Sequence, residues 1–226
     1  MINVVYAMTH HVYHMIVPSL LSLIKHNPDA RVFILCEDDT LDIPATAEII
    51  NVTGQEWFPE AGKNYHTTFK YINLLKVCYP LYLPVDKVIH LDIDTIVCEN
   101  LQPMFDIDLT GKWFAATPEY RGNYRAFGPV YYNMGVAVIN LEQMRKDNIV
   151  PKMIDLLNNT YQPYADQNAW NKFGIQMGKV VEMPLRYNEN KVTGYTSHPA
   201  IVHYCGHKDW WTNEKMYRVE YLNEYR

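Results

Sequence analysis

Residues 88–97 constrain the fold of this chain more strongly than any other stretch. The run is apolar and rich in β-branched side chains, but it also contains Asp92 and Asp94. Such a run predicts a buried strand, on which side chains two residues apart share a face. Two carboxylates buried together are costly unless they are paired or bind a cation, so the pattern predicts a divalent metal site. The alternative is that both acids cap a turn towards Glu99 and Asn100.

The order of the apolar runs predicts an α/β fold with a parallel sheet. Residues 2–7 and 31–36 are short apolar runs, and between them residues 13–26 have apolar side chains at helical spacing. A strand–helix–strand unit of this length implies parallel strands joined by a right-handed crossover. Further strands are expected at residues 48–52, 88–97, 113–117, 135–140 and 201–203. Further helices are expected at residues 67–79, ending before Pro80, at 141–159 with a break at Pro151, and at 166–172. Residues 122–129 and 187–199 are expected to form mobile loops.

The composition indicates a globular protein and argues against a nucleic-acid binder. The chain has 226 residues, of which 48% are hydrophobic and 20% charged, and this is enough for a full core. Its net charge is −5, whereas affinity for a phosphate backbone depends on an excess of Lys and Arg. The 18 tyrosines suit the recognition of sugars and nucleosides, and packing in the core and at its rim explains them equally well.

The cysteines and the N-terminal residues predict a cytoplasmic protein. Cys36, Cys78, Cys98 and Cys205 are far apart and include no CxxC pair. Free thiols in a reducing compartment are therefore expected rather than disulfides or a zinc site. The first residues lack the basic region of a signal peptide, and no apolar run reaches the ~18–20 residues of a membrane span.

Three further polar residues are candidates for chemistry, and each also has a simpler structural explanation. His203 follows an apolar run, and an imidazole joined to Asp92 and Asp94 suits Mn²⁺, Fe²⁺ or Zn²⁺ better than Ca²⁺. The alternative is a hydrogen-bonded histidine in the core. Asn133 offers both a donor and an acceptor to sugar hydroxyls, or else it closes a turn. Asp166 is the third candidate, with a helix N-cap as the alternative.

Taken in order along the chain, these motifs resemble a known family of enzymes. The matching segments are residues 91–95, which hold a DxD motif, 132–136 with 139–141, 166–167, and 201–206. Over residues 1 to about 211 the sequence is similar to the retaining, metal-dependent glycosyltransferases of family 8, which include glycogenin and bacterial galactosyl- and glucosyltransferases that build lipopolysaccharide. The resemblance implies a GT-A fold with a Rossmann-like, mainly parallel sheet flanked by helices. One domain is implied over residues 1–226, with a nucleotide-binding half at about 1–110 and an acceptor and sugar half at about 111–226.

The resemblance also implies roles for single residues. The metal, Mn²⁺ or alternatively Mg²⁺, would be held by Asp92, Asp94 and His203 against the diphosphate of a UDP-hexose. The nucleotide-sugar would further contact Ala7, Met8, Thr9, Tyr13, Lys76, Ile93, Asn133, Gly206 and Lys208. Tyr13 would stack on the uracil, and the catalytic residues around the anomeric carbon would be Asn133, Asp166 and Gln167. Because the segment after His203 is one residue shorter than in the family, either His207 or Lys208 would meet the diphosphate.

The implied reaction is the transfer of a hexose, either galactose or glucose, to an acceptor. The implied acceptors are a glycan, a lipopolysaccharide and a protein-linked sugar, and peripheral contact of the enzyme with a membrane is compatible with them. Because Gln167 is a poor nucleophile, we expect the acceptor to attack from the face that the diphosphate leaves. A nucleotidyltransferase shares the fold and the acidic metal pair, but its cue is a Gly-rich, basic phosphate loop, and residues 8–11 contain neither Gly nor Lys. Outside the enzymes, the alternative is a non-catalytic module that binds a sugar nucleotide or a glycan.

Overall fold

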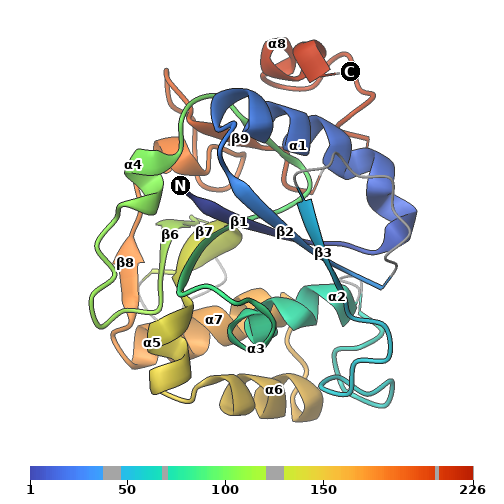
Figure 1. Cartoon of the computed structure of the whole chain (residues 1–226), viewed down its shortest axis with the longest axis vertical. Helices are drawn as coiled ribbons and strands as arrows, with labels where there is room; N and C mark the ends of the chain where they lie inside the picture. The colour runs from blue at the N-terminus through green and yellow to red at the C-terminus, as the bar shows by residue number, and fades with distance from the viewer. Residues whose placement is uncertain (38–46, 68–70, 121–129, 207–208, 226) are drawn as a thin grey trace.

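A seven-stranded sheet lies at the centre of the computed structural model, which describes residues 1–37, 47–67, 71–120, 130–206 and 209–225 (Figure 1). Its strands are β1 (Asn3–Ala7), β2 (Arg31–Cys36), β3 (Ala47–Asn51), β4 (Lys87–Leu91), β6 (Phe114–Pro118), β7 (Tyr132–Asn140) and β8 (Val180–Glu182). Their order across the sheet is β3-β2-β1-β4-β7-β6-β8. Among these described strands β7 runs antiparallel to both of its neighbours, and the other pairings are parallel. The predicted α/β fold with a mainly parallel sheet is confirmed.

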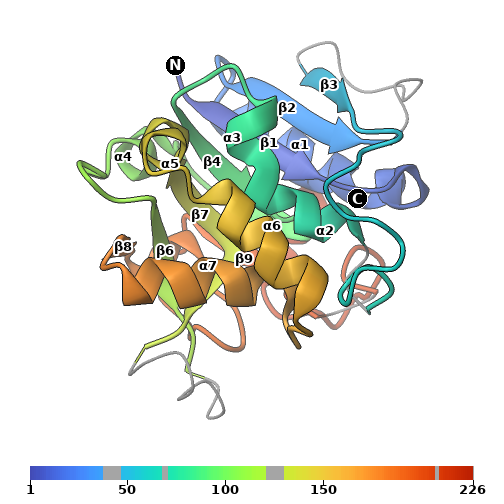
Figure 2. The same cartoon turned by 90° about the horizontal axis from the view of Figure 1, so that it is seen from below.

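Helices cover both faces of the sheet (Figures 1 and 2). They are α1 (Tyr13–His26), α2 (Tyr71–Leu74), α3 (Tyr79–Tyr82), α4 (Gln102–Phe105), α5 (Leu141–Lys146), α6 (Val150–Asn159), α7 (Ala165–Gln176) and α8 (Val219–Leu222). Short 3₁₀ turns are η1 (His10–Val12), η2 (Leu75–Cys78), η3 (Leu185–Tyr187) and η4 (Asn223–Tyr225). Helix α1 covers one face, and α5, α6 and α7 cover the other, with α2 and α3 beside them. None of the helices in the described part of the chain is long and apolar enough to cross a bilayer.

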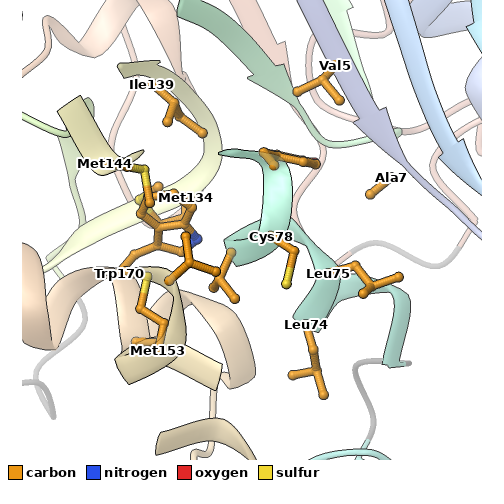
Figure 3. Packing of buried hydrophobic residues seen from close by; sticks show 14 of the residues in the cluster. Val5, Ala7, Leu74, Leu75, Cys78, Met134, Ile139, Met144, Met153 and Trp170 are labelled. Carbon is orange, nitrogen blue, oxygen red and sulfur yellow. The ribbon is translucent and has the colours of Figure 1, made fainter. Parts of the chain in front are cut away.

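Alternate residues of each central strand enter two separate cores. Val5 of β1 faces the helices α3, α5, α6 and α7, whereas Val4 and Tyr6 face α1. This alternation is the period of two that a strand imposes on its side chains. In the larger core, Met134, Met144 and Met153 surround the indole of Trp170 (Figure 3). Burial of these large apolar side chains on both faces fixes the sheet, and thereby the edge at which its strands end.

The expectation of one strand over residues 88–97 is wrong. Strand β4 ends at Leu91, and β5 (Thr95–Val97) pairs instead with β9 (Ile201–His203) in a separate antiparallel ribbon. Asp92 and Asp94 lie in the turn between β4 and β5, so they do not share a face of a strand. The physical reason is solvation: in this turn their side chains keep exposed fractions of 30% and 20%. Inside the sheet, these carboxylates would lose that contact with water.

Two proline predictions are also corrected. The helix expected to end before Pro80 continues to Tyr82, because Pro80 lies in the first turn of α3, where its missing N–H leaves no helical bond unmade. The helix expected over 141–159 does break, but at residues 147–149, and Pro151 lies in the first turn of α6. Residues 68–70 of the first of these expected helices lie outside the described residues, and the loop expected at 122–129 lies outside them entirely.

The other predicted elements differ from the structure at their ends, and β8, α4 and α8 were not predicted. Helix α7 extends to Gln176, and β7 begins three residues earlier than expected, at Tyr132. All four cysteines lie in described parts of the chain and are free thiols, as predicted.

Candidate functional site

A pocket of about 490 Å³ opens at the edge of the sheet where β1 and β4 end. Ligands of open α/β sheets bind at the carboxyl ends of parallel strands. Because β7 runs antiparallel to β4, its first residues lie at this edge as well, and they bring Asn133 and Gly135 into the pocket. The beginning of α7 supplies Asp166 and Gln167, and β9 supplies His203. Five separate segments therefore meet at one place.

Most of the predicted site residues line this pocket. They are Ala7, Met8, Thr9, Lys76, Asp92, Ile93, Asp94, Asn133, Asp166, Gln167, His203 and Gly206. Tyr13 is not among the described residues of the lining; it begins α1 and packs on the core beneath that helix. Lys208 and His207 lie outside the described residues.

Asp92, Asp94 and His203 form a group that could hold a divalent cation. One ligand atom from each lies within 4.8 Å of the others. Nε2 of His203 is 3.3 Å from Oδ1 of Asp94 and 3.9 Å from Oδ2 of Asp92. Two carboxylates and one imidazole are the donor set of Mn²⁺, Fe²⁺ or Zn²⁺ rather than of Ca²⁺. Burial lowers the pKa of His203, and Asp94 with Asp92 raises it by more, so the pKa lies above its ordinary value.

Asp92 is surrounded by cationic and hydrogen-bonding partners. Nζ of Lys76 lies 2.5 Å and Nε2 of His90 lies 3.1 Å from its Oδ1. Because an ionised carboxylate can only accept, His90 donates from Nε2, and its Nδ1 accepts from the hydroxyl of Tyr79 at 3.0 Å. Burial raises the pKa of Asp92, but Lys76 and His90 lower it by more, so it lies well below its usual range. Asp92 is therefore ionised and ready to bind a cation.

Gly135 is required by the close approach of β7 to the metal group. A Cβ on this residue would overlap the imidazole of His203 and lie 2.8 Å from Oδ2 of Asp92. The backbone of Gly135 also accepts the N–H of Asp92 at 2.7 Å. A side chain at this position would push two of the three candidate ligands out of place.

On the other side of the pocket, a network of amides surrounds a buried acid. Nδ2 of Asn133 donates to Oε2 of Glu119 at 2.9 Å, and Nε2 of Gln167 lies 3.4 Å from the same oxygen. Oε1 of Gln167 accepts the N–H of Met134 at 2.9 Å. Both amides are thus held in fixed orientations at the wall of the pocket. The network presents polar groups of both kinds to a ligand with hydroxyl groups.

Asp166 is a buried carboxyl group at the start of α7. Burial raises its pKa to about 7, and Lys76 opposes this shift without cancelling it. The helix cap is Tyr164, so the simpler explanation of Asp166 as an N-cap does not hold. An acid whose pKa is perturbed by burial inside a pocket is typical of functional sites.

Sequence reasoning missed His90, Glu119 and Asn188. His90 could have been found, because it precedes Asp92 by two residues in the same apolar run. Glu119 follows the last residue of β6, and nothing local distinguishes it from a surface acid. Asn188 was expected in a mobile loop, yet it is fully buried.

Comparison with sequence families gives a match over nearly the whole chain. A family model described as Glycosyl transferase family 8 matches residues 3–215. A putative glycosyltransferase of Haemophilus influenzae is 28% identical over 205 residues, which cover 80% of this chain and 56% of that protein. General stress protein A of Bacillus subtilis is 27% identical over 167 residues, covering 62% of this chain and 58% of that protein. The chain spans little more than half the length of these relatives.

Solved structures share the fold. The crystal structure of galactosyltransferase LgtC in complex with donor and acceptor sugar analogs aligns with a TM-score of 0.75 at 20% identity, covering 99% of this chain and 96% of that chain. The glycosyltransferase GlyE of Streptococcus pneumoniae aligns with a TM-score of 0.65 at 23% identity, covering 98% of this chain and 62% of that chain. At these identities the similarity shows the fold alone, and it confirms the predicted GT-A fold.

Proposed function

The chain belongs to glycosyltransferase family 8, and on this basis we propose that it transfers a hexose, galactose or glucose, from a UDP-sugar to a hydroxyl group with retention of configuration. The acceptor in this proposal is a glycan, a lipopolysaccharide or a protein-linked sugar. Residues 1–226 would act as one domain, with about 1–110 binding the nucleotide and about 111–226 contributing the sugar and acceptor side. The observation that carries the proposal is that Asp92, Asp94 and His203 meet beside the buried Asp166 in one pocket.

The nucleotide end of the donor is assigned to the edge formed by β1 and β4. Ala7, Met8 and Thr9 line the pocket there, close to the three candidate metal ligands. Mn²⁺ held by these ligands would neutralise charge that develops on the departing diphosphate. Lys76 is buried and its ammonium contacts Asp92, so it adds a fixed positive charge at the same end of the pocket.

The sugar is assigned to the side of the pocket formed by β7 and α7. Asn133 and Gln167 are oriented by Glu119 and by the Met134 N–H, and with Asp166 they can bind several hydroxyl groups. An amide oxygen is a poor nucleophile, and Oε1 of Gln167 already accepts a backbone N–H. This supports attack by the acceptor from the face that the diphosphate leaves, with a diphosphate oxygen taking the acceptor's proton.

The proposal predicts metal-dependent release of UDP from one or a few UDP-sugars. A panel of UDP-sugars is incubated with the protein in Mn²⁺ or in EDTA, without an acceptor, and free UDP is measured. We expect release in Mn²⁺ only, with Asp94→Ala at least ~100-fold slower because one of the three candidate ligands is lost. Asp155→Ala, a change at an exposed acid of α6, serves as the matched control and should retain wild-type release.

Three outcomes of this panel have different meanings. Release that is unaffected by EDTA would contradict the metal site. No release from any sugar, together with no thermal stabilisation by UDP and Mn²⁺, would contradict the proposed function. Stabilisation by UDP and Mn²⁺ without release would support the nucleotide site, and the same panel would then be repeated with candidate acceptors.

A further inference from the structure

Asn188 joins the candidate metal site to the sugar side of the pocket. It follows η3 and is fully buried. Its side-chain amide contacts three side chains: Nδ1 of His203 at 2.9 Å, Nδ2 of Asn190 at 2.9 Å and Oδ1 of Asn133 at 2.9 Å. A single buried amide therefore touches one candidate metal ligand and one residue of the proposed sugar site.

The orientation of this amide is fixed from the side of Asn133. The backbone N–H of Gly135 donates to one atom of the Asn133 side chain at 3.0 Å, so that atom is the oxygen Oδ1. The group of Asn188 that contacts the same oxygen must also be a donor, which identifies it as the Nδ2 amino group. The oxygen of Asn188 consequently faces the opposite way, towards His203.

A second chain of hydrogen bonds gives the same orientation independently. The backbone N–H groups of Val192 and Thr193 both donate to one atom of Asn190, at 2.9 and 3.0 Å, so that atom is Oδ1. The amino group of Asn190 therefore faces Asn188 and donates to its Oδ1. Because backbone N–H groups only donate, both chains start from a group whose polarity is certain.

These two chains determine which nitrogen of His203 carries the proton. Nδ1 lies 2.9 Å from Oδ1 of Asn188, an oxygen that cannot donate, so Nδ1 is the protonated nitrogen. Nδ2 of Asn190 is farther from Nδ1, at 3.5 Å, and its hydrogen bond goes to Asn188. When a cation occupies the site, Nε2 of the neutral ring is then left with its lone pair for the metal beside Asp92 and Asp94. Without a cation these two carboxylates favour a proton on Nε2 as well, because they can only accept hydrogen bonds.

We propose that Asn188 is a positioning residue, which holds His203 in the tautomer that binds a cation and, through its amino group, holds Asn133 for the sugar. The first part rests on the proposed metal site. Histidine ligands of metals commonly donate their second nitrogen to an acceptor, and loss of that acceptor weakens metal binding by about 10–100-fold. Here the acceptor is a neutral amide whose other end continues into the wall of the sugar pocket.

Two substitutions separate the two contacts. Asn188→Asp keeps an acceptor for His203 but places an oxygen against Oδ1 of Asn133, which cannot turn because it accepts the Gly135 N–H. Asn188→Leu has a similar volume and removes both contacts. The matched control is Asn64→Ala, which removes another fully buried asparagine amide. This amide donates to the backbone carbonyls of Leu157 and Thr160. Asn64 is not among the described residues that line the pocket.

The experiment combines two measurements. Long-range ¹H–¹⁵N correlation spectra of the protein loaded with diamagnetic Zn²⁺, a cation that this donor set also suits, identify the nitrogen of His203 that keeps its proton when the site is filled. Titration with Mn²⁺, followed by the electron paramagnetic resonance of the free ion, gives the affinity.

We expect a proton on Nδ1 in the wild type and in Asn188→Asp. Mn²⁺ affinity should fall by about 10–100-fold in Asn188→Leu and stay within about threefold in Asn188→Asp and Asn64→Ala. Asn188→Asp should lower the rate of UDP release by at least ~10-fold, because only the Asn133 contact is lost.

A proton on Nε2 and none on Nδ1 in the Zn²⁺-loaded wild type overturns the inference, and so does wild-type Mn²⁺ affinity in a folded Asn188→Leu protein. Unchanged UDP release in Asn188→Asp overturns the part that concerns Asn133. Failure of the proposed function has a different signature, namely a wild-type protein that binds the cation with the Nδ1 proton in place but releases UDP from no UDP-sugar.

Discussion

Between about pH 4 and pH 7, Asp166 keeps its proton in the folded protein, whereas the same side chain is ionised in the unfolded chain. Burial raises its pKa to about 7, whereas an unfolded aspartate titrates near a pKa of about 3.9. A raised folded-state pKa contributes stability that is present at low pH and is lost as the pH rises from about 4 to about 7. We expect Asp166→Asn, which is neutral throughout, to match the metal-free wild type near pH 4 and to exceed it above pH 7 by about 4 kcal/mol.

Thermal unfolding of the two metal-free proteins at about pH 4 and pH 8 measures this difference. Asp155→Asn, at an exposed position, is the control and should show no pH-dependent gain. A gain of equal size at both pH values would show that the proton of Asp166 is not its cause.

Gly135 offers a test of the metal site that leaves all candidate ligands in the chain. Gly135→Ala places a methyl group against His203 and Asp92, so we expect Mn²⁺ affinity to fall by about 100-fold or more, as measured by titration. Gly111→Ala is the matched control. A Cβ there would meet nothing within 4 Å, so the substitution strains only the backbone, whose φ at Gly111 is +70°. Equal loss of Mn²⁺ affinity in the two variants would mean that general destabilisation explains the effect.

Single residues with a short-range signal were predictable, and residues that depend on distant contacts were not. Asp92 and Asp94 stand out because acids are rare in an apolar run, and His203 because it follows another such run. Asn188 has no local signal, since its importance comes from contacts with Asn133, 55 residues away in sequence, and with His203.

At the scale of elements, the apolar runs predicted which segments form strands but not how they pair. Strands β4 and β5 are both buried, so residues 88–97 look like one strand in the sequence. Besides leaving Asp92 and Asp94 in contact with water, the turn between β4 and β5 lets β5 pair with β9, far along the chain. A periodic pattern reports the burial of a segment and contains no information about its neighbour.

Asn171 of helix α7 binds both backbone groups of Tyr132, the first residue of β7. Asn171 is fully buried, accepts the Tyr132 N–H at 2.7 Å and donates to the Tyr132 carbonyl at 2.8 Å. Because Asn171→Ala leaves two backbone groups without these partners, we expect it to lower the free energy of unfolding by about 2 kcal/mol.

Urea denaturation measures this loss, with Asn159→Ala at the exposed end of α6 as the control. The control is expected to cost less than about 0.5 kcal/mol, because its side chain bonds only within its own helix turn. Equal losses in both variants would contradict a special role for the contact between α7 and β7.

For the whole molecule, the fold class was predictable because it depends on the order of the elements, and the order is written in the hydrophobic pattern. The pocket was only partly predictable. It needs the ends of β1 and β4, the first residues of an antiparallel β7, the start of α7 and the ribbon of β5 and β9 to meet. The direction of β7 places Asn133 at this edge, and no local pattern specifies that direction.

The pairing of β5 with β9 has a consequence for the order in which the protein is made. His203 is synthesised about 110 residues after Asp94, and β9 is not part of the main sheet, whose last strand along the chain is β8. A chain emerging from the ribosome therefore contains every strand of that sheet before it contains the third candidate ligand. Under the proposed function, the full set of cation ligands exists only after β9 has been made. A nascent chain that stalls before β9 lacks His203, so we expect it to bind Mn²⁺ more weakly than the chain that contains β9.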